Sequence, residues 1–282
     1  MKIAGLTARI TCLALCTAFG AFAAKPAAIQ LPAAVAAKKQ VTVGVNGIFP
    51  PMEFKNPGSD TLTGFDVELA QAIGQTLGVK VVFDDQKFDQ LLTSVTTNRV
   101  DFVLSGLSST AVRQKTFDFI EYFTSGTQAY TTREQAKGIN SLESLSGKTL
   151  AVSAATDYLT NIQKWSKENL EAKGKPGITM LPVDSEATAR LQMVQGRAQA
   201  SAISPEVFGW LGKQNPGKFV AFGPILAPRP YGICFKKDNV QLRNAVLAAL
   251  KELVKNGTYN KILAKWDLSR SGMEPLVNGV KM

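Results

Sequence analysis

A lone arginine follows a run of small polar residues in SGLSSTAVR, residues 105–113. The run comes directly after an apolar, strand-like stretch, so the chain passes here from a strand into a helix. Thr110 is a suitable N-cap, which places Arg113 in the first helical turn. Free backbone N–H groups in that turn favour an anion, and Gly106 lets the backbone approach a ligand closely.

Arg113 has two interpretations. A guanidinium in a first turn opposes the helix dipole, so helix stability does not explain its presence. Its planar fork suits a bidentate grip on a carboxylate, which would make it a ligand clamp. The alternative is a surface arginine paired with Glu121 or Asp118. The spacing alone does not choose between the two.

Other candidates follow the ends of predicted strands, where open parallel sheets bind ligands. Asn46 and Phe49 come after the first strand, and the segments SAATD (residues 153–157) and ISPE (residues 203–206) follow strands further along the chain. Phe49 and Phe88 are either flat walls for a ligand or core residues, and core is the commoner fate of phenylalanine. Asp66 and Glu68, at the start of a helix, are interpreted as complementing its dipole rather than as a catalytic pair.

The N-terminus has the pattern of a cleaved secretory signal over residues 1–23. Lys2 and Arg9 precede a short apolar stretch, and Ala21 and Ala23 flank a small-residue cleavage site. The apolar stretch is too short to span a membrane, so we expect an exported protein without an anchor.

Composition excludes several classes of function. The chain has no histidine, so we expect no metal, no cofactor and no histidine-based hydrolysis. Its net charge of +10 comes from scattered Lys and Arg, which indicates a basic solvated surface rather than a nucleic-acid site. Cys234 is the one cysteine left after signal removal, and we expect it to be a buried small hydrophobe.

The apolar pattern predicts a repeated arrangement of strands and helices. After a flexible tether over residues 24–40, a β-α-β-α-β pattern begins at Val41 and returns in the second half of the chain. This indicates two α/β lobes, each with a mostly parallel sheet, with one large sheet as the alternative. Extended stretches at residues 124–135 and 222–237 are the expected crossings between lobes. Two crossings make a hinge over a cleft that can close.

The predicted domains follow from these crossings. Lobe 1 covers residues 41–126 and 229–282, because the two C-terminal helices are expected to return to it, and lobe 2 covers residues 127–228.

Five segments in this order resemble the periplasmic solute-binding proteins of polar amino-acid ABC importers, the bacterial extracellular family 3. They are FPPMEF, LTGFDVELAQAIGQTLGVKVVF, SGLSSTAVRQKTFDF, YGICFKK and KILAKWDL. The resemblance implies a two-lobed type II periplasmic-binding-protein fold with helices flanking each sheet. It also implies a periplasmic monomer without enzymatic activity that captures an amino-acid-like ligand and hands it to a membrane permease.

The resemblance also implies site residues. Arg113 matches the clamp for the ligand α-carboxylate, Ser108 a supporting donor and Gly106 a backbone acceptor for the ligand amine. The remaining matches are the aromatic walls Phe49 and Phe88, the polar contact Asn46, and Thr156 on the second lobe, which meets the carboxylate.

The chain departs from the family pattern in lobe 2. Ser204 stands where most relatives carry an aspartate for the ligand ammonium, and Asp157 adds a carboxylate to a loop in which Ala155 replaces a glycine. A buried ammonium without a counter-charge is costly. Either Asp157 or Glu206 therefore takes over this role, or the ligand lacks a free amino group, as in an opine or a plain organic acid.

An exported enzyme on the same scaffold is the rival function. The chain is also similar to cyclohexadienyl dehydratases, which act on prephenate or arogenate and need an acid in the closed cleft. Glu206 and Asp157 are the candidates for that acid.

Overall fold

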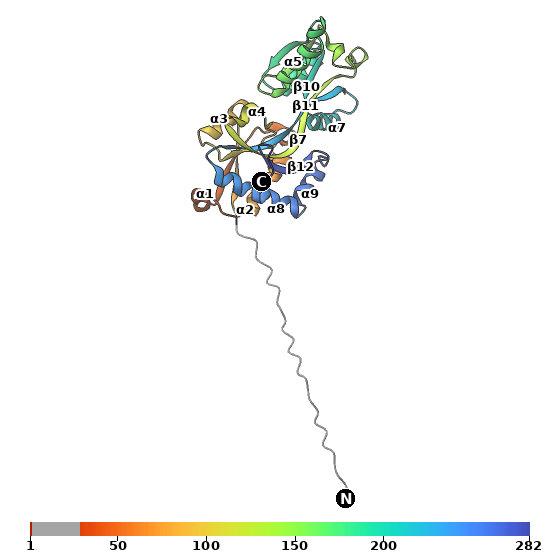
Figure 1. Ribbon diagram of the computed structural model, residues 1–282. Coiled ribbons are helices and arrows are strands. Elements are labelled where there is room, and N and C mark those ends of the chain that lie inside the picture. The colour runs from red at the N-terminus through yellow and green to blue at the C-terminus, as the bar shows by residue number, and fades with distance from the viewer. Residues whose placement is uncertain (2–28) are drawn as a thin grey trace.

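The computed structural model shown in Figure 1 describes Met1 and residues 29–282. The predicted signal peptide, apart from Met1, lies outside the described residues. The predicted tether over residues 24–40 differs from the structure in its described part. Residues 33–38 form the short helix α1 (Ala33–Lys38), and Val35 in this helix is 6% exposed because it packs on the core of the first lobe.

The first lobe contains a parallel sheet in the order β5-β1-β6. Its elements are β1 (Gln40–Val45), α2 (Phe65–Leu77), β5 (Lys80–Asp85), the 3-10 turn Phe88–Gln90, α3 (Leu91–Thr96) and β6 (Phe102–Val103). A small antiparallel sheet lies beside it, made of β2 (Ile48–Phe49), β3 (Glu53–Lys55) and β4 (Leu62–Thr63). The predicted parallel arrangement of this lobe is confirmed.

The second lobe repeats the arrangement with a parallel sheet in the order β10-β8-β9. Its elements are β8 (Thr149–Ser153), α5 (Asp157–Asn169), β9 (Thr179–Val183), α6 (Glu186–Val194), β10 (Ala200–Ile203) and α7 (Pro205–Gln214), with 3-10 turns at Gln135–Lys137, Glu143–Leu145 and Glu171–Lys173.

Two long antiparallel strands, β7 (Phe117–Thr132) and β11 (Phe219–Lys236), run from one lobe to the other (Figure 1). Their hydrogen bonds join both parallel sheets into one continuous path. The cores nevertheless remain separate: in β7, Phe123 packs in the core of lobe 1 and Ala129 in that of lobe 2. The prediction of two lobes is therefore confirmed, and the alternative of one large sheet holds only in that the crossing strands connect the two sheets.

The C-terminal segment packs on the first lobe. It consists of α8 (Val240–Lys255), α9 (Thr258–Lys265) and β12 (Gly272–Val277). Leu250 of α8 and Ile262 of α9 lie in the same core as Leu69 of α2, and Tyr259 donates a hydrogen bond to the backbone oxygen of Tyr122 on β7. Apolar residues at helical spacing thus seal the outer face of this lobe.

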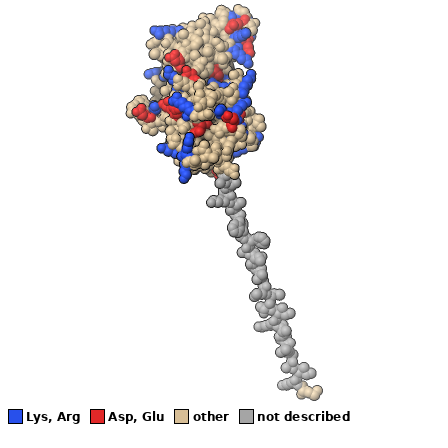
Figure 2. Space-filling model, turned by 90° about the vertical axis from the view of Figure 1, so that its left-hand side faces the viewer, with Lys and Arg blue, Asp and Glu red and all other residues tan. Residues whose placement is uncertain are grey.

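The surface carries both signs of charge. Figure 2 shows Lys and Arg scattered between Asp and Glu on the face in view, without one continuous basic patch. Within the described residues, no helix has both the length and the apolar character needed to cross a membrane. Cys234 is fully buried on β11, which confirms its predicted environment.

Candidate ligand-binding site

The loop between β6 and α4 (Ala111–Gln114) positions the arginine that the sequence singles out. Thr110 is the N-cap, and its side chain accepts a hydrogen bond from the backbone N–H of Arg113 at 3.3 Å. The predicted cap and first helical turn are confirmed. Arg113 therefore projects from a short, capped helix at the carboxyl end of the sheet.

Buried carboxyl groups hold this loop from behind. The N–H of Gly106 donates to Asp66 Oδ2 at 2.8 Å. Ser105 Oγ donates to Glu53 Oε1 at 2.6 Å and accepts from the N–H of Asn46 at 2.9 Å. The sequence predicts only that Asp66 complements a helix dipole. In the structure Asp66 is fully buried, and its carboxylate also accepts the hydrogen bond from Gly106. It fixes the backbone of the predicted ligand-binding loop.

Burial raises the pKa of both carboxyl groups. Desolvation raises the pKa of Asp66 to about 6, although hydrogen bonds from Gly106 and Tyr122 favour its charged form. Desolvation and then the charge of Asp66 raise the pKa of Glu53 well above its usual range. Burial therefore favours the protonated form of Glu53 beside Asp66, behind the loop.

Neither of the carboxylates considered as surface partners pairs with Arg113. Asp118 forms an ion pair with Arg243, and Glu121 accepts a hydrogen bond from Ser109 Oγ at 2.9 Å. The interpretation of Arg113 as a paired surface arginine is therefore wrong. Within the described part of the chain, no ion pair engages its guanidinium.

The guanidinium of Arg113 is held by backbone instead. Its Nη1 donates to the carbonyl oxygen of Ser108 at 3.0 Å. The other N–H groups of the guanidinium remain able to donate to a ligand. Burial lowers the pKa of Arg113, and the nearby charge of Asp157 opposes that shift. A half-buried cation of this kind is suited to a carboxylate.

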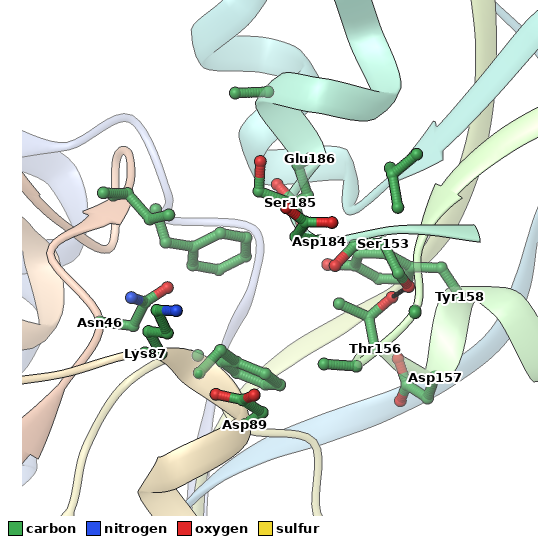
Figure 3. Close-up of a pocket in the computed structure, with 18 of the residues that line it drawn as sticks. Asn46, Lys87, Asp89, Ser153, Thr156, Asp157, Tyr158, Asp184, Ser185 and Glu186 are labelled. Atoms are coloured by element: carbon green, nitrogen blue, oxygen red, sulfur yellow. Dashed lines mark hydrogen bonds between the residues drawn. The ribbon is translucent and has the colours of Figure 1, made fainter. Parts of the chain in front are cut away.

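A cavity of about 590 Å³ lies between the two lobes (Figure 3). It brings together every ligand-binding residue predicted from the sequence except Ser204. From lobe 1 these are Asn46, Phe49, Phe88, Gly106, Ser108 and Arg113, and from lobe 2 they are Thr156 and Asp157. Groups from both lobes therefore face one space, as a cleft that closes on a ligand requires.

The two phenylalanines combine their alternative roles. Phe49 lines the cavity and also packs against hydrophobic clusters of both lobes, and Phe88 lines it while packing on the cluster around Leu91. Asn46 is fixed at the edge of the cavity because its Nδ2 donates to the carbonyl oxygen of Gln86 at 2.8 Å. Each ring is thus anchored on one side and available to a ligand on the other.

On the second lobe, the N-cap and the first residue of α5 supply a hydroxyl and a paired carboxylate. Thr156 Oγ1 donates to the carbonyl oxygen of Ser153 at 2.8 Å. Asp157 Oδ2 lies 2.7 Å from Arg229 Nε of β11, an ion pair without hydrogen-bond alignment. The charge of Asp157 is therefore compensated within the protein before any ligand arrives.

Ser204 is a correction. It is the N-cap of α7, its side chain is fully buried, and it does not line the cavity. Glu206, the other acid considered there, also stays away from the cavity: it is 8% exposed and accepts hydrogen bonds from Ser125 Oγ at 3.0 and 2.9 Å.

Sequence reasoning missed the residues that follow β5 and β9. The cavity is also lined by Lys87, Asp89, Asp184, Ser185 and Glu186. Figure 3 shows Glu186 at the start of α6, together with Asp184 and Ser185. The rule that ligands bind at carboxyl ends of parallel strands, applied to these two strands as well, would have found them.

Replacing Gly106 with alanine is expected to weaken both folding and binding. Gly106 has φ of +50°, and a Cβ there would lie 2.6 Å from Cε1 of Phe49. Strain and displacement of the ring should lower the free energy of unfolding by about 1–3 kcal/mol. Thermal unfolding and calorimetric titration measure both effects. Gly58→Ala is the matched control, because Gly58 also has positive φ (+77°) but open space around it; equal losses in the two variants would contradict the steric argument.

Comparison with known proteins decides the family. Residues 41–269 match the description of bacterial extracellular solute-binding proteins, family 3. The chain belongs to this family. A family 3 protein is named for binding solutes, which agrees with a cavity whose predicted ligand residues come from two lobes.

Individual relatives of this solute-binding protein carry different ligand names. It is 29% identical to the arginine-binding protein ArgT of Corynebacterium glutamicum, over 88% of this chain and 81% of ArgT. It is also 29% identical to the L-cystine-binding protein TcyJ of Escherichia coli K12, over 79% of this chain and 81% of TcyJ. The crystal structure of the ancestral amino acid-binding protein AncCDT-1, a precursor of cyclohexadienyl dehydratase, has a TM-score of 0.72 and 30% identity, over 83% of this chain and 97% of that one. The predicted two-lobed type II fold is confirmed.

Proposed function

We propose that this chain is the substrate-binding component of an ABC importer and captures an amino acid or a similar carboxylate by closure of the cleft. The observation that carries the proposal is the guanidinium of Arg113, which forms no ion pair within the described residues and lies half-buried in a cavity lined by both lobes. The relatives named as arginine- and cystine-binding proteins support the ligand class. Arg113 clamps the carboxylate and Ser108 adds a donor from lobe 1, while the hydroxyl of Thr156 joins from lobe 2 by exchanging its bond to Ser153 for one to the ligand.

The remaining proposed contacts are of two kinds, apolar and polar. Phe49 and Phe88 enclose the apolar part of the ligand, Asn46 meets its polar side-chain atoms, and the carbonyl oxygen of Gly106 accepts from its amine. Because these groups belong to both lobes, the ligand contacts more of them in the closed form than in the open form. That difference in contact free energy shifts the population toward closure.

The proposed function also implies a cellular location and a partner. Cleavage after residue 23 releases a monomer into the periplasm, where lobe 1 (residues 41–126 and 229–282) and lobe 2 (residues 127–228) close around the ligand. The closed form then docks on a membrane-embedded permease, which receives the ligand. In this role the protein binds and releases its ligand unchanged, and we therefore propose that it is not an enzyme.

A dehydratase on the same scaffold is the second candidate. AncCDT-1, the precursor of such an enzyme, supports it, and so does Glu186, an acid in the cavity. Incubation of the purified protein with prephenate or arogenate tests it. Formation of an aromatic product would establish the enzyme, whereas unchanged substrate together with tight amino-acid binding would favour the importer.

Titration calorimetry of ligand-free protein against the L-amino acids, L-cystine and their N-acetyl derivatives tests the main proposal. We expect one class of these compounds to bind with a dissociation constant of about 1 μM or below, equivalent to roughly −8 kcal/mol. Ligand is first removed by unfolding and refolding, and mass spectrometry of the released small molecules gives an independent identification. Failure of every compound to bind would contradict the proposed function.

A further inference from the structure

The carboxyl groups of Asp157, Glu186 and Glu206 are not equally available to a ligand in the cavity. Asp157 is paired with Arg229 at 2.7 Å, and Glu206 is bound by Ser125 away from the cavity. Ser204, at the position where the family resemblance implies an aspartate, does not line it. Neither acid proposed from the sequence therefore supplies a free counter-charge for a ligand cation.

Glu186 differs from both of these acids. It is the first residue of α6, after the N-cap Ser185, whose side chain accepts from the N–H of Thr188 at 3.2 Å. Glu186 lines the cavity and is half-buried, and within the described residues no lysine or arginine forms an ion pair with it. The carboxyl group of Glu186 is therefore partly shielded from solvent and can still contact a ligand in the cavity.

The surroundings of Glu186 are more acidic than basic. Desolvation, followed by the charge of Glu206, raises the pKa of Glu186 to about 8, while Arg190 and the hydroxyl of Tyr158 reduce the rise. The titratable groups whose charge influences Glu186 are Glu53 of β3, Tyr130 of β7, Tyr158 of α5, Arg190 of α6 and Glu206 of α7, and Asp184 lines the same cavity two residues before it. Carboxyl groups thus outnumber the one nearby arginine, so this end of the cavity favours a ligand cation over a ligand anion.

We propose that Glu186 binds the cationic end of the ligand and gives up its proton to solvent when that cation enters. The proposal rests on the proposed function, since it needs a ligand whose carboxylate lies on Arg113. Burial in the free protein favours the neutral carboxyl group over the carboxylate. A ligand ammonium or guanidinium stabilises the carboxylate, so the O–H bond of Glu186 breaks and the proton passes to the buffer.

This assignment narrows the substrate class. A ligand with a carboxylate at one end and a cation at the other satisfies Arg113 and Glu186 together. N-acylated amino acids and plain organic acids would leave Glu186 without a partner and are therefore disfavoured. Glu186 is in this sense the specificity-determining residue for an amino acid with a free amino or guanidino group.

Calorimetry in two buffers tests the proton release on the unaltered protein. L-Arginine, or the L-amino acid that the panel above selects in its place, is titrated at pH 7 in phosphate and in Tris, whose ionisation enthalpies differ. We expect the release of close to one proton per bound ligand. The chain has no histidine, so few other groups titrate in this range. Binding without proton release would overturn the proposal while leaving the proposed function intact.

The variant Glu186→Gln should lose the proton release and bind the same amino acid at least about tenfold more weakly, while the preference over its N-acetyl derivative shrinks. Glu168→Gln on α5 is the matched control, since Glu168 lies at an exposed site outside the cavity and should change nothing. Unaltered affinity and proton release in Glu186→Gln would overturn the assignment. Failure of the wild type to bind any compound overturns the proposed function and this inference together.

Discussion

Replacing Arg113 with alanine is expected to remove ligand binding almost completely. The guanidinium is half-buried, and the one other basic residue among the described residues that line the cavity is Lys87, which is exposed. Removing one partner of a buried, hydrogen-bonded charge pair costs about 2–5 kcal/mol, which corresponds to a loss in affinity of roughly 30- to several-thousand-fold. Arg113→Lys should recover part of the loss, because an ammonium restores the charge but not the bidentate geometry. Titration calorimetry with the identified ligand measures both variants.

Arg99→Ala provides the matched control for this experiment. Arg99 pairs with Asp84 at 2.6 Å on the surface of the same lobe and does not line the cavity. Its removal alters the net charge as much as Arg113→Ala does, yet the affinity should stay the same. Thermal unfolding must show that Arg113→Ala is folded. If the folded variant bound the ligand as tightly as the wild type, Arg113 would not be the clamp.

The parts of the fold that sequence predicts well are those set by local pattern. α2 has Phe65, Leu69, Ile73 and Leu77 on its buried face and ends at Gly78, which adopts the left-handed conformation with φ of +69°. The side-chain spacing and the terminal glycine are both visible in the sequence. The same is true of Thr110 and the first turn of α4. The position of Arg113 in the first turn of α4 can therefore be predicted from the residues next to it in the chain.

The parts that sequence predicts poorly depend on partners far away in the chain. Arg229 reaches Asp157 from the crossing strand β11, and no local pattern indicates that this pair neutralises a carboxylate at the edge of the cavity. Glu186 looks like an ordinary acidic residue at the start of a helix. It is half-buried because α6 packs on β8, β9 and β10 of the second lobe. Partners supplied by distant segments, Arg229 for Asp157 and Ser125 for Glu206, separate the compensated acids from the available one.

Raising the pH from 5.5 to 8 is expected to destabilise the ligand-free protein. Glu186, with an ordinary pKa of 4.5 and a folded-state pKa of about 8, and Asp66, with 3.8 and about 6, both hold a proton more tightly in the folded state. Their stabilising contributions are complete below the unfolded-state values and disappear as the pH rises through about 6 for Asp66 and about 8 for Glu186. Each such carboxyl group lowers the free energy of unfolding by up to about 1.4 kcal/mol per pH unit inside its window.

The absence of histidine makes this pH range unusually informative. No imidazole titrates between pH 5.5 and 8, so the perturbed carboxyl groups and the terminal amine account for the slope. Denaturant unfolding at several pH values should show the loss, and Glu186→Gln should flatten the curve above pH 6 while Asp66→Asn flattens it below. Glu168→Gln, at an exposed site, should leave the slope unchanged. A wild-type stability that stayed constant or rose from pH 6 to 8 would mean that Glu186 is ionised in the free protein, and its release of a proton to an incoming cation would then have no source.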